Sequence, residues 1–274
     1  MINSSILYKQ LKKWVKKPNG CDEWQCYLTF NGDKVFATDS HRLVVIKNYP
    51  SAEPHFETPE GSINKDVYIP KLNDYTLQEY IVKDITPKVE KIIPPDSGIC
   101  KCQYSTIISS IWFDHMKNAF NFIKKASKKS HQTSYSGSCM LNFHDNKLYV
   151  IGAGEAYGAK FLLSDNLEEG TPWYCCFNAG YLIDLMDLLI DTKAPATKFS
   201  VRLNRIPENS LNRDKPEDER WTALWKFETD DIIAICTSLR ISRGKDSAQL
   251  DPFMKFFEKE SVIPANGAAI EVKE

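Results

Sequence analysis

The run ATDSHRL, residues 37–43, holds the side chains of this sequence that could do chemistry together. Asp39 and His41 are two residues apart, the spacing at which two side chains of one strand share a face. Such a pair could act as an acid and a base. The sequence places no serine or cysteine nucleophile for it, and Arg42 can pair with a nearby carboxylate as structure. We therefore expect no catalysis and no cofactor.

The same run is also costly, because it interrupts an apolar strand expected over residues 34–47. Five consecutive polar side chains separate Ala37 from Leu43. Polar groups buried in a strand cost free energy unless they turn, pair with one another or face a binding site. The sequence alone leaves these three explanations open.

A glycine-rich stretch, VIGAGEAYG at residues 150–158, has spacing like that of a dinucleotide-binding turn. Such a site requires its glycines to open a helix whose N-terminus meets a pyrophosphate. The residues that follow, AKFLL from Ala159, are typical of a strand. The stretch therefore predicts a turn rather than a nucleotide site.

The chain has eight cysteines but no CxxC pair and no histidine at zinc-finger spacing. We expect reduced thiols in a reducing compartment, without a metal site or disulfides. These cysteines are Cys21, Cys26, Cys100, Cys102, Cys139, Cys175, Cys176 and Cys236.

Composition indicates a soluble chain of two ordinary domains, with 274 residues, 42% hydrophobic content and a net charge of -1. Lysines interrupt the apolar residues near the N-terminus, which is not typical of a signal peptide. No run approaches the ~20 apolar residues that a membrane span needs. We therefore expect a cytoplasmic protein.

The pattern of elements predicts the same order twice: a helix, a hairpin, strands, a helix and further strands. The first half has an expected helix at 6–17, strands at 25–30 and 34–47, a loop at 50–61, a short strand at 67–70, a helix at 72–81 and an extended segment at 82–95. The second half has helices at 111–129 and 178–190, and strands at 139–143, 147–151, 159–164, 198–204, 222–228 and 232–237. We expect domains at 1–104 and 105–242, followed by a tail at 243–274.

Four motifs, in this order, resemble those of the bacterial DNA polymerase III beta sliding clamp family. ATDSHRL resembles the ATDGHRL signature of the clamp's middle domain. PKVEKIIP, at residues 87–94, resembles the PDYxxxxP segment, with Val89 in place of the aromatic residue. FNAGYLIDLMDLL looks like a NARYLLD-type helix, and TSLRI resembles the terminal MPMRL. The chain is thus similar to the second and third domains of a clamp, with the first domain absent.

The resemblance implies an α+β fold of two tandem clamp-like domains, each an antiparallel sheet with two helices on its inner face. It further implies a non-enzymatic processivity or recruitment factor of DNA replication that encircles duplex DNA. Its partners would be DNA polymerase or other replication proteins, bound through short peptide motifs. A six-domain ring with two domains per chain would be a homotrimer. The alternative is a clamp-fold adaptor that does not encircle DNA.

Sliding on duplex DNA requires cationic inner helices without base recognition. Two expected helices are rich in lysine, although solvated helix faces would show the same pattern. Asp184, Asp187 and Asp191 give the helix at 178–190 the opposite charge. The expected DNA-binding residues are Lys9, Lys12, Lys13, Lys16, Lys17, Lys117, Lys124, Lys125, Lys128 and Lys129.

The resemblance also implies a peptide-binding pocket with apolar walls and a polar rim of hydroxyls and arginines. Its residues would be Thr38, Ser40, His41, Arg42, Leu43, Pro87, Ile92, Ile235, Thr237, Ser238, Leu239 and Arg240. Thr237 and Ser238 stand where the family has Met and Pro, which makes one wall smaller and more polar.

The tail contains QLDPF, residues 249–253, which resembles the QL(S/D)LF peptide that clamps bind. One hypothesis is that the tail docks in a clamp pocket. The alternative is a short amphipathic helix over residues 251–257 that packs on the body.

Overall fold

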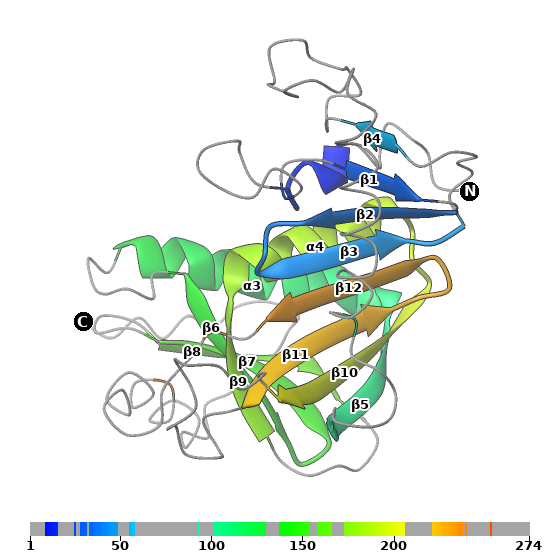
Figure 1. Cartoon of the computed structure of the whole chain (residues 1–274). Helices are drawn as coiled ribbons and strands as arrows, with labels where there is room; N and C mark the ends of the chain where they lie inside the picture. Colours follow the sequence, from blue (N-terminus) through cyan, green and yellow to red (C-terminus); the bar gives the residue numbers. More distant parts are fainter. Residues whose placement is uncertain are drawn as a thin grey trace, which may run out of the picture. The chain divides into compact units, whose positions relative to one another are not determined.

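The computed structural model describes residues 9–15, 25, 28–31, 33–48, 55–57, 93, 101–129, 137–153, 158–165, 173–205, 221–237, 239 and 253. The chain divides into two compact units, and their helices and strands are labelled in Figure 1. Unit 1 comprises Met1–Pro95 and Lys226–Cys236, and unit 2 comprises Asp96–Trp225 and Thr237–Glu274. Antiparallel strands and a few helices build them, so the predicted α+β class is confirmed. The domain limits expected from the sequence stay a prediction.

Unit 1 is built on antiparallel strands in the order β4-β1-β2-β3-β12. The strands are β1 (Leu28–Asn31), β2 (Lys34–Thr38), β3 (Arg42–Ile46), β4 (His55–Glu57) and β12 (Ile232–Thr237). Apolar residues of β2 and β3 are buried on both strand faces, as expected for a central pair. The central position of β3 follows from its pairing with β2 on one side and β12 on the other.

Three expectations for unit 1 are wrong in detail. The single strand expected over residues 34–47 is two antiparallel strands, β2 and β3. The loop expected over residues 50–61 contains β4, which pairs with β1. Gln25, expected to begin a strand, lies in a 3-10 turn. Local composition cannot reveal such pairing, because a strand is stabilised by its neighbour.

The helix expected over residues 6–17 is helical at 9–11 and then gives way to a turn and a bend at 12–15. The amide of Lys13 donates to the Gln10 carbonyl at 3.1 Å, and that of Trp14 donates to the Leu11 carbonyl at 2.8 Å. These i to i+3 bonds tighten the chain. Both Leu11 and Trp14 are thereby fully buried, so packing overrides the helical pattern.

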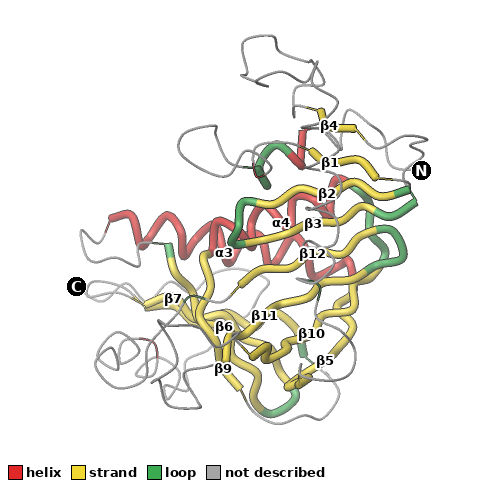
Figure 2. The backbone as a smooth tube through the Cα atoms, in the orientation of Figure 1, coloured by secondary structure: helices red, strands yellow, loops and turns green. Residues whose placement is uncertain are grey.

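Unit 2 has a four-stranded antiparallel sheet in the order β8-β7-β6-β9 (Figure 2). Its strands are β6 (Ser138–His144), β7 (Lys147–Ala153), β8 (Gly158–Ser164) and β9 (Trp173–Asn178). The unit also contains β5 (Lys101–Ser109), η2 (Ser110–Trp112), α3 (Phe113–Lys129), α4 (Ala179–Asp191), β10 (Ala196–Arg205) and most of β11 (Trp221–Glu228). The helix expected from Ile111 therefore begins two residues later, after a 3-10 turn.

The helices α3 and α4 pack against each other, and α3 lies on β6, β7 and β8. Gly152 of β7 permits this approach, because a Cβ added there would lie 2.6 Å from Cγ1 of Ile123. The glycine stretch is therefore strand at Gly152, and β8 begins at Gly158, so no helix follows it. In the described residues, a strand stands where a dinucleotide-binding turn would require a helix.

Some expected elements lie outside the described residues. These are the strand at 67–70, the helix at 72–81, the extended segment at 82–95 apart from Ile93, and the tail apart from Phe253.

Candidate functional site

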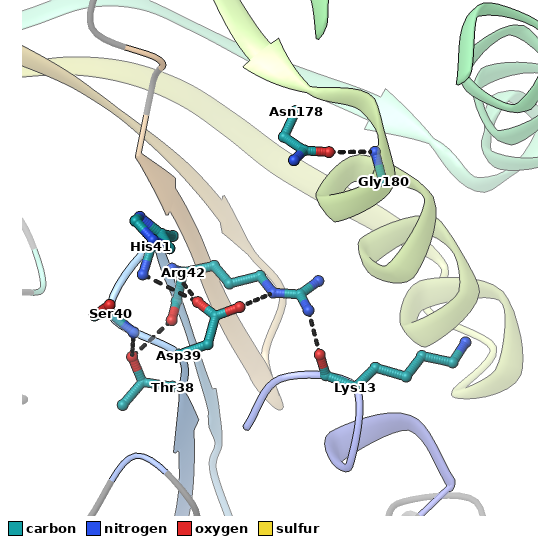
Figure 3. A network of polar contacts seen from close by, with 8 residues as sticks. All are labelled: Lys13, Thr38, Asp39, Ser40, His41, Arg42, Asn178 and Gly180. Atoms are coloured by element: carbon teal, nitrogen blue, oxygen red, sulfur yellow. Dashed lines mark hydrogen bonds and ion pairs between the residues drawn. The ribbon is translucent and has the colours of Figure 1, made fainter. Parts of the chain in front are cut away.

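The ATDSHRL run forms the tip of the β2–β3 hairpin (Figure 3). Thr38 pairs with Leu43 at the end of the ladder, and the amide of Asp39 donates to the Arg42 carbonyl at 3.3 Å. Ser40 and His41 are the exposed residues of the turn. The polar residues are therefore at the end of two strands rather than within one, which is the first of the three explanations left open.

Asp39 and Thr38 organise this turn by pairing with their neighbours. One carboxylate oxygen of Asp39 accepts from the amides of His41 and Arg42, each at 3.0 Å, and the other accepts from Nε of Arg42 at 2.9 Å. The Thr38 hydroxyl donates to the Arg42 carbonyl at 2.7 Å and accepts from the Ser40 amide at 3.2 Å. The Asp39 carboxylate thus has a structural role, and an acid–base pair with His41 is not supported.

Ser40 has a left-handed backbone, with φ of 73°. Only glycine adopts this region without a steric cost, because it has no Cβ. The position is the one at which ATDSHRL differs from the ATDGHRL signature. The substitution therefore leaves the turn in place and adds strain to it.

Arg42, expected at the rim of a pocket, is buried with 6% of its surface exposed. Its guanidinium pairs with Asp39, donates through Nη2 to the Lys13 carbonyl and lies 4.9 Å from the centre of the Trp14 ring (Figure 3). These contacts fasten the N-terminal segment to the hairpin. No sequence pattern indicates Lys13 and Trp14 as partners, since about 30 residues separate them from Arg42.

Three of the expected pocket residues form one row across β2, β3 and β12. Leu43 is the cross-strand partner of both Thr38 and Ile235, and all three are buried. Arg42 is next to Leu43 on β3, so its side chain lies on the opposite face. Thr237 and Leu239 belong to unit 2 and are half-buried. Pro87, Ile92, Ser238 and Arg240 lie outside the described residues.

The expected DNA-binding lysines differ in their surroundings. Lys9, Lys12 and Lys125 are exposed, whereas Lys13, Lys117 and Lys124 are half-buried. Lys124 lies beside the first turn of α4, since its Nζ would be 3.2 Å from a Cβ added at Gly180. Lys16 and Lys17 are outside the described residues, as are the side chains of Lys128 and Lys129.

Lys117 forms an ion pair with Asp187 of α4 at 2.8 Å. The hydrogen bond that Lys117 donates to the Asp187 carboxylate raises the pKa of Lys117, with further contributions from nearby carboxylates. The charge of this lysine is thus offset within the protein. The partner, Asp187, belongs to α4, the helix that the sequence predicts to be acidic. Asn178 caps this helix, since its side-chain oxygen accepts from the Gly180 amide at 2.8 Å (Figure 3).

Other kinds of site find little support in the part of the chain that the structure describes. Cys139, Cys175, Cys176 and Cys236 carry reduced thiols. Within the described ranges, no group of three His, Cys, Asp or Glu side chains could hold a metal ion. No described helix combines the length and apolar character needed to cross a membrane.

Comparison with known proteins identifies similar structures but no similar sequences. No protein-family model matches this sequence, and a search of curated proteins finds no match. The DNA polymerase III beta chain of Streptococcus pneumoniae is 12% identical with a TM-score of 0.52, over 88% of this chain and 64% of that chain. The Pseudomonas aeruginosa subunit beta is 13% identical with a TM-score of 0.51, over 88% and 66%.

The Helicobacter pylori beta clamp, solved with a DNA ligase peptide, is 12% identical with a TM-score of 0.50, over 87% of this chain and 64% of that chain. This chain therefore spans less than two thirds of the length of the first clamps. At such low identity the similarity concerns the fold alone. The chain has a fold like that of the bacterial DNA polymerase III beta sliding clamps.

Proposed function

We propose that this chain is a sliding-clamp-like, non-enzymatic protein of DNA replication that encircles duplex DNA. The observation that carries the proposal is the clamp-like fold with lysines on α3, one of the two helices packed together in unit 2. A clamp binds the phosphate backbone without reading bases, so it needs cations and little else. In a ring of six such domains, three copies of this chain would be present.

Ion pairing and exposure of the lysines indicate which of them would bind duplex DNA. Lys117 is already paired with Asp187, so it contributes less to phosphate binding than its position suggests. Lys125 is exposed, and Lys124 is half-buried beside α4. Lys12 is an exposed cation of unit 1. We expect Lys12, Lys124 and Lys125 to account for much of the affinity for duplex DNA.

The test compares two triple variants of the full chain. Lys12→Ala/Lys124→Ala/Lys125→Ala should weaken duplex binding and lower the salt dependence of log K by up to about 2–3 units. The control, Lys147→Ala/Lys193→Ala/Lys198→Ala, removes three exposed lysines from other positions and should change neither. Fluorescence anisotropy over a salt series measures both quantities. Equal effects of the two variants would contradict the assignment of the DNA-binding face.

Encirclement is tested on the unsubstituted chain. A closed ring should stay on nicked circular DNA in high salt and run off after the circle is linearised, and light scattering should give the mass of three chains. Equal retention on both forms of DNA, or a monomer at high concentration, would favour the adaptor that does not encircle DNA.

Partners that carry short peptide motifs are the second part of the proposal. The Helicobacter pylori clamp was solved with such a peptide, from DNA ligase. In this chain the hairpin tip offers Ser40 and His41 to solvent, above the buried row of Thr38, Leu43 and Ile235. The wider pocket inferred from the sequence stays a prediction.

A further inference from the structure

Phe253 of the C-terminal tail is buried, with 6% of its surface exposed. It has helical backbone and belongs to an apolar cluster with Met140, Ile151 and Cys176. Ala153 and Leu239 pack against the same cluster. The tail residue therefore contacts strands that precede it by about 80 residues or more. Phe253 is the only described residue of the helix expected over residues 251–257, so that helix stays a prediction.

The cluster is a single row across the four-stranded sheet, here called the apolar row: Ile151, Met140 and Cys176. Met140 of β6 is the cross-strand partner of Ile151 on β7 and of Cys176 on β9. Partners directly opposite each other point to the same face of a sheet. The three side chains are therefore adjacent and together present one apolar strip.

Phe253 packs on the face of the sheet opposite α3. Gly152 is next to Ile151 on β7, and its missing Cβ would point at Ile123 of α3. Because neighbouring residues of a strand face opposite sides, α3 lies on one face and the apolar row on the other. A sheet with a second apolar face requires a cover, and a tail residue supplies it here.

The segment after β12 converges on the same place. The amide of Leu239 donates to the carbonyl of Cys176 on β9 at 2.9 Å. Leu239 and Phe253 thus both reach the apolar row from the C-terminal side. One aromatic side chain is a small part of a domain core, so its docking can be reversible while the sheet persists.

We propose that the apolar row is a docking site for an aromatic side chain of a short peptide segment, and that the chain's own segment around Phe253 is its occupant. The inference holds whether or not the chain encircles DNA. It assigns a peptide-binding surface to the sheet of unit 2. The occupant is recognised through one phenylalanine held by a methionine, an isoleucine and a cysteine.

Cys176 reports on the occupancy of this site. Burial raises the pKa of its thiol well above the usual value, and maleimide reacts with the thiolate. Cys139, one residue before Met140, points to the other face of the same sheet and is also fully buried. Labelling of Cys176 without labelling of Cys139 therefore separates release of Phe253 from unfolding of the sheet.

The experiment measures maleimide labelling of the full chain by mass spectrometry, with Cys175→Ser as the common background. Phe253→Ala should label at Cys176 at least ~10-fold faster than the parent, since burial of a phenylalanine is lost. Cys139 should stay protected. A peptide of residues 246–258 should restore the protection of Cys176 in a saturable manner, whereas the same peptide with Phe253→Ala should not.

Three results would overturn the proposal. Equal labelling of Cys176 in both proteins would show that Phe253 does not cover it. Parallel labelling of Cys176 and Cys139 would show that Phe253 is an integral core residue rather than a docked one. Phe253→Leu should give intermediate labelling, and lack of any protection by the peptide would likewise exclude a docking site.

Discussion

At the scale of single residues, the hairpin tip shows how a polar run can be structural. Asp39 accepts three hydrogen bonds from the turn that follows it. The energetic cost of polar groups at the end of β2 is offset by these contacts, so no catalytic role is needed to explain them. The one residue that fits poorly is Ser40, because its φ is 73°.

Ser40→Gly should stabilise unit 1 by about 0.5–1 kcal/mol, since relief of left-handed strain exceeds the added entropy of the unfolded chain. Ser40→Ala keeps the Cβ and should give no gain. Urea unfolding curves with an unchanged slope provide the measurement. A midpoint for the glycine variant at or below that of the alanine variant would argue against strain at this position.

At the scale of elements, close packing between α3 and the sheet explains part of the glycine-rich stretch. A methyl group on Gly152 would meet Cγ1 and Cγ2 of Ile123 at 2.6 and 2.9 Å, well inside contact distance. The helix would have to move away from β7, or Ile123 would have to change rotamer. Both responses are costly in a packed core.

Gly152→Ala should therefore destabilise unit 2 by about 1–3 kcal/mol. Ile123→Ala alone removes buried methyl groups and should cost about 2–5 kcal/mol. In the double variant the new methyl group occupies the space vacated by Ile123, so the combined loss should be smaller than the sum. Thermal or urea unfolding of all four proteins completes the cycle, and strictly additive losses would contradict the proposed contact.

At the scale of the whole molecule, unit 1 consists of two chain segments that most of unit 2 separates in the sequence. Lys226–Cys236 belongs to unit 1, where β12 pairs with β3. Glu228 in this segment accepts from Nζ of Lys226 at 2.7 Å and from Nζ of Lys47 at 3.2 Å. Burial alone would raise the pKa of Glu228, but the two lysines outweigh it and the pKa is lowered.

A lowered pKa makes stability depend on pH in a defined direction. The folded state holds Glu228 ionised at pH values where the unfolded chain already binds a proton. The contribution is therefore complete above the ordinary glutamate pKa of about 4.3 and is lost as the pH falls through the folded value. Lowering the pH below about 4.5 should destabilise unit 1 by at most about 1.4 kcal/mol per pH unit through this group.

Glu228→Gln should remove this part of the slope between about pH 3 and 5. Asp230→Asn, at an exposed carboxylate in the following turn, is the matched control and should leave the slope nearly unchanged. Unfolding free energies across this range provide the test. Equal slopes for the parent and the glutamine variant would show that the lysines do not hold Glu228 ionised.

Several elements could be predicted because their causes are local. The apolar face and the Asn178 cap place α4 within one residue of its expected limits. Apolar runs identify β6, β8 and β12 nearly in full. The division of the strand at ATDSHRL could not be predicted, since a serine gives no sign of a left-handed turn.

The sequence by itself determined the α+β class, the helices α3 and α4, and the segregation of lysines on α3 from aspartates on α4. Only the tertiary structure decided what each polar or apolar group contacts: Arg42 with Lys13 and Trp14, Lys117 with Asp187, and Phe253 with the apolar row. The physical reason is that helices, caps and turns depend on neighbours in sequence. Contacts between residues far apart in the sequence depend instead on which surfaces of these elements pack against each other in the folded protein.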